Sequence, residues 1–305
     1  MINRRQVMQL GASLAALGTT GVRAAAPVED DLITRPIPSS GERVPIIGMG
    51  TSRTFDTGGD AESVQQLADV MQAFFAGRGT VIDSSPMYGS AESRVGDVLR
   101  RMAESPQVFA ATKVWTTGES EGIEQMETSA QRMNIEVFDL IAIHNLQDWR
   151  THLATLKDWK EEGKVRYIGI TTSHGRDHEE LLDIMASEPL DFVQFSYNIE
   201  DRVAEERLLP LSAERGIATM INRPYQRGSL FGRSRGKPLP DVAGDIDCES
   251  WAQFYLKWIM GHPAATCVIP ATSKVHHMQD NMQANFGRLP DTAQREEMSR
   301  VFTAL

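Results

Sequence analysis

The sequence predicts a single (β/α)8 barrel, a closed ring of eight parallel strands with helices around it. Short apolar runs recur about every 30 residues, which is the length of one strand, one helix and their loops. The runs are almost entirely apolar, as expected for parallel strands covered on both faces. Three of them end on a polar residue: Asp83, Lys113 and His144. These residues are therefore predicted at the carboxyl ends of neighbouring strands, where barrels build their functional sites.

The individual elements follow in order along the chain. Strands are expected at 46–50, 80–83, 108–113, 138–144, 165–171, 192–195, 217–221 and 266–269. Amphipathic helices are expected at 61–76, 91–103, 122–133, 151–162, 178–186, 205–215 and 275–284, with a peripheral helix at 291–305. The stretch from 222 to about 247 lacks a period and contains several Gly and Pro residues. A loop of that length in a compact barrel predicts a lid or specificity loop.

Composition limits the class of protein. The 305 residues are 24% charged and 41% hydrophobic, which suits one globular domain with a large core, here assigned to 27–305. Acidic residues outnumber basic ones by 41 to 31, and the net charge of −10 argues against binding to nucleic acid or anionic lipid. Two cysteines, Cys248 and Cys267, give no disulfide framework and are expected to be buried as small hydrophobic residues.

The first 26 residues have the pattern of an export signal. Arg4 and Arg5 precede an uncharged stretch at 9–22, and small residues follow at 24–26. The paired arginines predict the twin-arginine export machinery as a partner and the periplasm as the location. The stretch is too short and too rich in Gly, Ser and Thr for a stable membrane span. A cytoplasmic leader is the alternative.

Four ordered motifs between 44 and 284 resemble the aldo-keto reductase family. The segment Val81–Glu92, which contains Asp83-Ser84-Ser85-Pro86-Met87-Tyr88-Gly89, resembles its second-strand signature. The others are Thr112–Trp115, Ile143-His144, and Cys267–Lys274 followed by Asp280-Asn281. The resemblance implies an oxidoreductase that interconverts carbonyl compounds and alcohols with NADP(H).

The chemistry of carbonyl reduction explains this set of residues. Hydride addition leaves a developing alkoxide that needs a proton, and a tyrosine with a pKa near 10 is a suitable donor. Tyr88 is the candidate acid. Lys113 would lower its pKa and Asp83 would hold Lys113, while His144 would orient the carbonyl oxygen. A phosphate-binding barrel lyase or isomerase would lack this cluster, and a nicotinamide-binding sensor on the same fold is the non-enzymatic alternative.

The cofactor residues are implied by the resemblance alone, because no glycine-rich Rossmann or phosphate loop is present. Thr171, Thr172 and Gln194 stand where the family holds the carboxamide, and Asn222 replaces the tyrosine that stacks on the nicotinamide. Ala271 and His277 replace a lysine and an arginine of the phosphate segment. NADP(H) is expected, with NAD(H) left open. The expected phosphate and adenine residues are Pro270, Thr272, Ser273, Lys274, His277, Asp280 and Asn281.

Three aromatic residues beyond strand ends are candidates for an apolar substrate wall: Trp115, Phe55 and Trp149. Trp115 also matches a pocket residue of the family, whereas packing within their loops is an equal alternative for Phe55 and Trp149. The histidine pairs at 174 and 178 and at 276 and 277 lack accompanying cysteine or carboxylate ligands, so no metal site is predicted.

Overall fold

The computed structural model describes residues 32–102 and 106–305, and residues Leu32–Leu305 form one compact unit. The predicted export signal at 1–26 lies outside the described residues. Within the part described, no helix combines the length and the apolar character that a membrane span requires.

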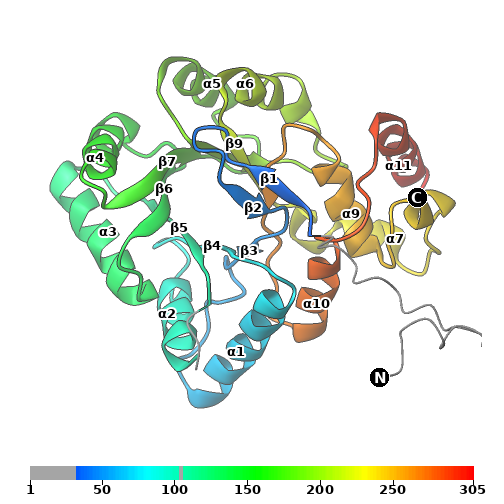
Figure 1. Cartoon of the computed structure of the whole chain (residues 1–305), viewed down its shortest axis with the longest axis horizontal. Coiled ribbons are helices and arrows are strands. Elements are labelled where there is room, and N and C mark those ends of the chain that lie inside the picture. The colour runs from blue at the N-terminus through cyan, green and yellow to red at the C-terminus, as the bar shows by residue number, and fades with distance from the viewer. Residues whose placement is uncertain (1–31, 103–105) are drawn as a thin grey trace, which may run out of the picture. The chain divides into compact units, whose positions relative to one another are not determined.

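Eight parallel strands form a nearly closed barrel (Figure 1), which confirms the predicted fold class. Each strand pairs with the next in chain order, and parallel bridges between Ile47 and Val268 and between Gly50 and Ala271 join the first strand to the last. The strands are β3 (Met49–Gly50), β4 (Val81–Asp83), β5 (Phe109–Val114), β6 (Phe138–His144), β7 (Val165–Thr171), β8 (Phe192–Ser196), β9 (Ala218–Asn222) and β10 (Cys267–Val268).

The helices surround the strands (Figure 1) and begin or end on the expected local signals. Asp60 caps the first of them by accepting from the Ser63 amide, and Gly216 ends the sixth in the left-handed conformation. The predicted helices correspond to α1 (Ala61–Ala76), α2 (Ala91–Arg101), α3 (Glu119–Met133), α4 (Trp149–Glu161), α5 (His178–Ser187), α6 (Leu208–Arg215), α10 (Val275–Gln283) and α11 (Thr292–Ala304). The turn η1 (Val203–Glu205) precedes α6.

The region between β9 and β10 differs from its prediction. The stretch 222–247 contains η2 (Gln226–Gly228), α7 (Leu230–Ser234) and α8 (Asp241–Asp245), so it is not one irregular loop. The helix α9 (Trp251–Met260) follows, and the sequence analysis missed it. Every residue of α9 after Trp251 is buried, including the polar Gln253 and Lys257, so the helix has no solvent-exposed polar face.

A hairpin that was not predicted lies beneath the barrel. It consists of β1 (Thr34–Pro36) and β2 (Arg43–Pro45), and each strand is too short to show an alternating pattern. Its Ile37 is fully buried and packs in one cluster with inward-facing residues of the barrel, among them Val81 and Phe109. The hairpin therefore closes the amino-terminal end and leaves the carboxyl end of the barrel as the open one.

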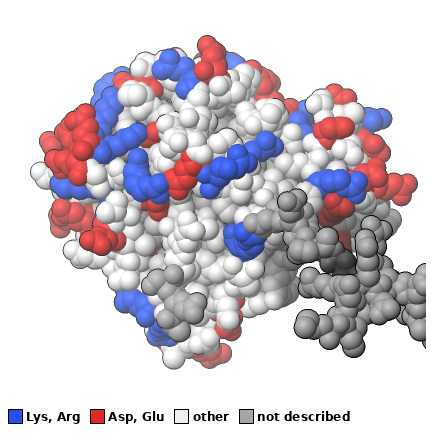
Figure 2. Space-filling model, in the orientation of Figure 1, with Lys and Arg blue, Asp and Glu red and all other residues white. Residues whose placement is uncertain are grey.

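The surface around the hairpin carries mixed charge. Figure 2 shows acidic and basic side chains interspersed over this face, with no extended basic patch. Cys248 and Cys267 are buried free thiols, as expected, and burial raises the pKa of each to about 12.

Candidate active site

Strand alternation determines which side chains enter the barrel. Along β5, the alternate residues Phe109, Ala111 and Lys113 face the same side of the strand. Phe109 and Ala111 belong to the interior cluster beneath the site, so Lys113 also faces the barrel interior. On the other strands too, the inward-facing residues are apolar near the amino-terminal end of the barrel and polar at its carboxyl end. The polar set is Asp83, Lys113, His144, Thr171, Gln194, Ser196 and Asn222.

A cavity of about 1030 Å³ opens at this end, at the upper limit of the range typical of ligand sites. Its wall includes Asp83, Tyr88 and His144. The structure thus brings three of the four predicted catalytic residues onto one surface, and Lys113 lies directly behind them.

Lys113 and Asp83 form a buried ion pair. The Lys113 ammonium donates to both Asp83 carboxylate oxygens at 2.7 and 2.8 Å and to the Ser84 carbonyl oxygen at 2.8 Å. Burial disfavours the ammonium, but the Asp83 carboxylate, together with Tyr88 and Glu92, more than offsets it, so the pKa of Lys113 lies above its usual value. A permanent positive charge is therefore fixed under the cavity.

Tyr88 stands next to this charge. The Lys113 ammonium nitrogen lies 5.3 Å from the centre of the Tyr88 ring, and the ring meets His144 edge-on at 5.7 Å between centroids. Burial and the Asp83 carboxylate raise the pKa of Tyr88, and Lys113 only partly offsets them. The phenol is therefore protonated at neutral pH and is ready to act as a proton donor.

His144 is held neutral. Burial, Lys113 and Arg176 lower its pKa to about 3. The Ser85 hydroxyl oxygen lies 2.9 Å from His144 Nδ1 and accepts from the Met87 amide at 3.2 Å. The Ser85 hydroxyl can donate its proton to Nδ1, and in that tautomer the His144 proton stands on Nε2. A neutral Nε2–H is the form that donates to a carbonyl oxygen.

Polar residues at the carboxyl end of the barrel form a hydrogen-bonded network. Thr171 donates to the Gln194 side-chain oxygen at 2.9 Å, and Gln194 donates to Asp83 at 3.2 Å. Asn222 donates to the Thr172 carbonyl oxygen at 3.0 Å. The Thr172 hydroxyl oxygen is buried without a partner, but Thr172 lies outside the cavity lining, unlike its chain neighbours Thr171 and Ser173.

The residues predicted at the phosphate and adenine end divide into two groups. Thr272, His277, Asp280 and Asn281 line the cavity, and Asn281 accepts from the Tyr225 hydroxyl at 2.7 Å. The others lie outside the lining: Pro270, Ser273 and Lys274.

None of the three aromatic residues predicted for the substrate wall lines the cavity. Phe55 is fully buried in the core, and Trp149 donates to Glu180 outside the lining. Trp115 is 40% exposed, and its ring lies 6.4 Å from that of His144. In the described residues no cluster of three metal-ligating side chains occurs.

Sequence reasoning missed one hydrogen-bonding residue and four charged ones. Ser85 stands two residues after Asp83, and this alternate spacing could have identified it as a residue of the site. The cavity is also lined by Arg53, Arg176, Arg223 and Arg227, which follow strand ends in loops without periodicity.

Curated relatives match most of the chain. A methylglyoxal reductase of Escherichia coli, YeaE, is 27% identical over 245 residues, which covers 78% of this chain and 84% of the relative. The aldo-keto reductase str7 of Strobilurus tenacellus is 25% identical over 278 residues, covering 77% and 82%.

Solved structures share the fold. An aldo-keto reductase from Klebsiella pneumoniae in complex with NADPH has a TM-score of 0.70 at 23% identity, covering 89% of this chain and 96% of that one. The holo form of AKR11C1 from Bacillus halodurans has a TM-score of 0.72 at 19% identity, with the same coverage. The model of the aldo/keto reductase family matches residues 46–298, and with the site geometry this establishes that the chain belongs to that family.

Proposed function

We propose that the protein reduces an aldehyde or ketone to an alcohol, or catalyses the reverse reaction, with NADP(H) as cofactor. The observation that supports this most directly is the placement of Tyr88 and His144 on one cavity wall above the buried Lys113–Asp83 pair. The family membership and the NADPH complex of a structural relative agree with it.

The proposed mechanism assigns one task to each residue. His144 Nε2–H donates to the carbonyl oxygen of the substrate and holds it near Tyr88. A nicotinamide nucleotide held in the cavity would supply the hydride for the carbonyl carbon. Tyr88 gives its phenolic proton to the oxygen as negative charge develops there, and Lys113 stabilises the resulting phenolate. Asp83 keeps Lys113 charged and in place.

The residues of the cavity fit a nicotinamide nucleotide. Thr171 and Gln194, which the resemblance assigns to the carboxamide, line the cavity and are bonded to each other, and the unpartnered Thr172 hydroxyl follows Thr171 in the chain. His277 and the amino end of α10 would receive phosphate, aided by Lys274 close by. His277 in place of arginine weakens the recognition of a 2′-phosphate, so NADH remains an alternative cofactor.

Nucleotide titration followed by a carbonyl panel tests this function. Trp251 lines the cavity, so tryptophan fluorescence should respond when NADPH or NADH binds. Oxidation of the bound form by an added aldehyde or ketone is then followed by absorbance. A protein that binds neither nucleotide would contradict the proposal and favour a non-enzymatic role.

We also propose that the chain is exported through the twin-arginine route to the periplasm. Arg4, Arg5 and the weakly apolar stretch at 9–22 support this. Replacing both arginines by lysine should retain the uncut precursor in the cytoplasm without changing its circular dichroism. Processed protein outside the inner membrane despite this change would exclude the route.

A further inference from the structure

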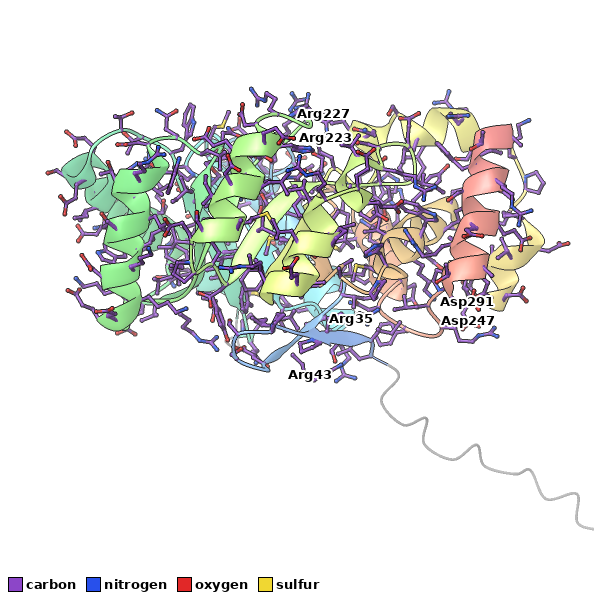
Figure 3. All side chains as sticks on the ribbon, turned by 90° about the horizontal axis from the view of Figure 1, so that it is seen from above. Arg35, Arg43, Arg223, Arg227, Asp247 and Asp291 are labelled. Atoms are coloured by element: carbon purple, nitrogen blue, oxygen red, sulfur yellow. The ribbon has the colours of Figure 1, made fainter. Side chains whose placement is uncertain are left out.

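Four arginines, here called the arginine rim, line the cavity. Arg53 follows β3, Arg176 follows β7, and Arg223 and Arg227 follow β9. In Figure 3, Arg223 and Arg227 lie together at the end of the barrel opposite Arg35 and Arg43 of the hairpin. Three separate loops thus bring guanidinium groups to one opening.

These arginines lack acidic partners. Among the residues that the structure describes, none of the four forms an ion pair with a carboxylate. Arg223 donates through Nε and Nη2 to the Gln226 side-chain oxygen at 3.2 and 2.9 Å, and its Nη1 is buried without a partner. Buried donors of a charged group are normally paired, so the unpartnered Arg223 Nη1 indicates that a ligand accepts from it.

His174 adds to the same surface. Its Nε2 accepts from Arg227 Nη2 at 3.0 Å, and its Nδ1 contacts the Ser173 hydroxyl at 2.7 Å. Burial and the charges of Arg223, Arg227 and Arg176 lower the pKa of His174, which keeps the ring neutral and able to accept. The histidine therefore orients Arg227 without competing for an anion.

The nearby carboxylates do not neutralise the rim. Asp56 accepts from the Ser90 amide and hydroxyl, and Asp280 accepts from the Gln253 side-chain amide. Asp201 acts on Arg223 from a distance, without an ion pair. Excess positive charge therefore remains at the mouth of a protein whose net charge is −10.

The position of Arg176 connects the rim to the reacting centre. Its charge acts on His144, the residue proposed to hold the carbonyl oxygen. Arg176 and His144 line the same cavity, so a ligand in that cavity can contact both residues.

We infer that the carbonyl substrate is anionic, with a carboxylate or phosphate group that the arginine rim binds while its carbonyl reaches Tyr88 and His144. This inference rests on the proposed reductase function. Guanidinium groups match both anions through paired N–H donors. The phosphates of the nucleotide are the other possible source of negative charge, and the experiment separates the two.

The first measurement compares matched substrates. Each pair consists of an anionic aldehyde and a neutral one. The pairs are succinic semialdehyde with butanal, and glyceraldehyde 3-phosphate with glyceraldehyde. For the wild type we expect kcat/KM to favour the anionic member of at least one pair by roughly 10- to 100-fold, the gain of one charge-assisted contact. Equal values for both pairs would overturn the inference and leave the reductase proposal intact.

The second measurement assigns the preference to the rim. Arg176 is exposed, so Arg176→Met should fold and should lower the ratio of anionic to neutral kcat/KM by roughly 10-fold or more. Arg215→Met is the matched control, because Arg215 is exposed in the last turn of α6, at the opposite end of the barrel. A weakened affinity for NADPH with an unchanged substrate ratio would assign the arginine to the cofactor and refute the inference.

A binding assay keeps the inference testable without turnover. Calorimetry with succinate and with inorganic phosphate is performed on the NADP⁺ complex, and on the free protein if no nucleotide binds. Binding of either anion that Arg176→Met weakens and Arg215→Met preserves supports the rim site. No binding of either anion to the wild type counts against it. If the wild-type protein binds an anion but reduces none of the carbonyl compounds tested, the result would instead contradict the reductase proposal.

Discussion

The neutral state of His144 makes a quantitative prediction about stability. Its pKa falls from 6.5 to about 3 in the folded protein, and its side chain is almost fully buried. Because the His144 pKa is lower in the folded protein, the unfolded state binds a proton between pH 6.5 and 3 that the native state does not bind. Stability is therefore complete above pH 6.5 and decreases as the pH falls from 6.5 towards 3. The loss due to this one residue is about 2 kcal/mol at pH 5 and about 3 kcal/mol at pH 4.

Urea unfolding of wild type and His144→Gln at pH 8 and pH 5 measures this effect. The wild type should lose about 2 kcal/mol more than the variant between the two pH values, because glutamine does not titrate. His276→Gln is the control, since His276 is exposed on α10 and the same change there should preserve the wild-type loss. Equal losses in wild type and His144→Gln would refute the assignment of a buried neutral imidazole.

Three further substitutions test individual contacts of the site. Tyr88→Phe should reduce turnover by about 10² to 10⁴ while nucleotide affinity changes only a few-fold, and near-normal turnover would remove Tyr88 as the acid. Ser85→Ala should lower kcat by about 3- to 10-fold, as expected for the loss of one hydrogen bond that orients His144, and an unchanged kcat would show that Ser85 has no such role. Thr172→Val should leave the unliganded protein as stable or more so but weaken nucleotide binding by about 3- to 10-fold. Unaltered affinity would remove Thr172 from the cofactor site.

The barrel and its three strand-end residues were predictable from the sequence for a physical reason. Parallel strands buried on both faces leave uninterrupted apolar runs, so a polar residue at the end of a run is conspicuous. Asp83, Lys113 and His144 all ended such runs, and the structure places them at one end of the barrel. Their alignment requires only the order and register of the strands.

The missed features lack any local signal of this kind. Helix α9 is buried along nearly its whole length, and only Gln253 and Lys257 interrupt its apolar sequence, so no run of exposed polar residues marks it as a helix. The arginine rim is assembled from loops far apart in the sequence, and each arginine alone resembles an ordinary surface residue. Phe55 was assigned to the cavity because it follows a strand, but its side chain turns into the core. The direction of a loop side chain depends on tertiary packing, which a single sequence does not specify.

The Lys113–Asp83 pair is best explained by function, because burial of two charges seldom stabilises a fold. Replacing such a pair with apolar groups is often neutral or stabilising, whereas removing one partner costs about 3–5 kcal/mol. Lys113→Met should therefore abolish turnover and also destabilise the protein, and Asp83→Asn should be the milder change for activity. The double variant Asp83→Asn/Lys113→Met removes both charges and should recover most of the lost stability without recovering activity. Recovery of turnover together with stability would show that the pair serves the fold, and strictly additive losses of activity in Lys113→Met and Tyr88→Phe would show that the two residues do not act as one unit.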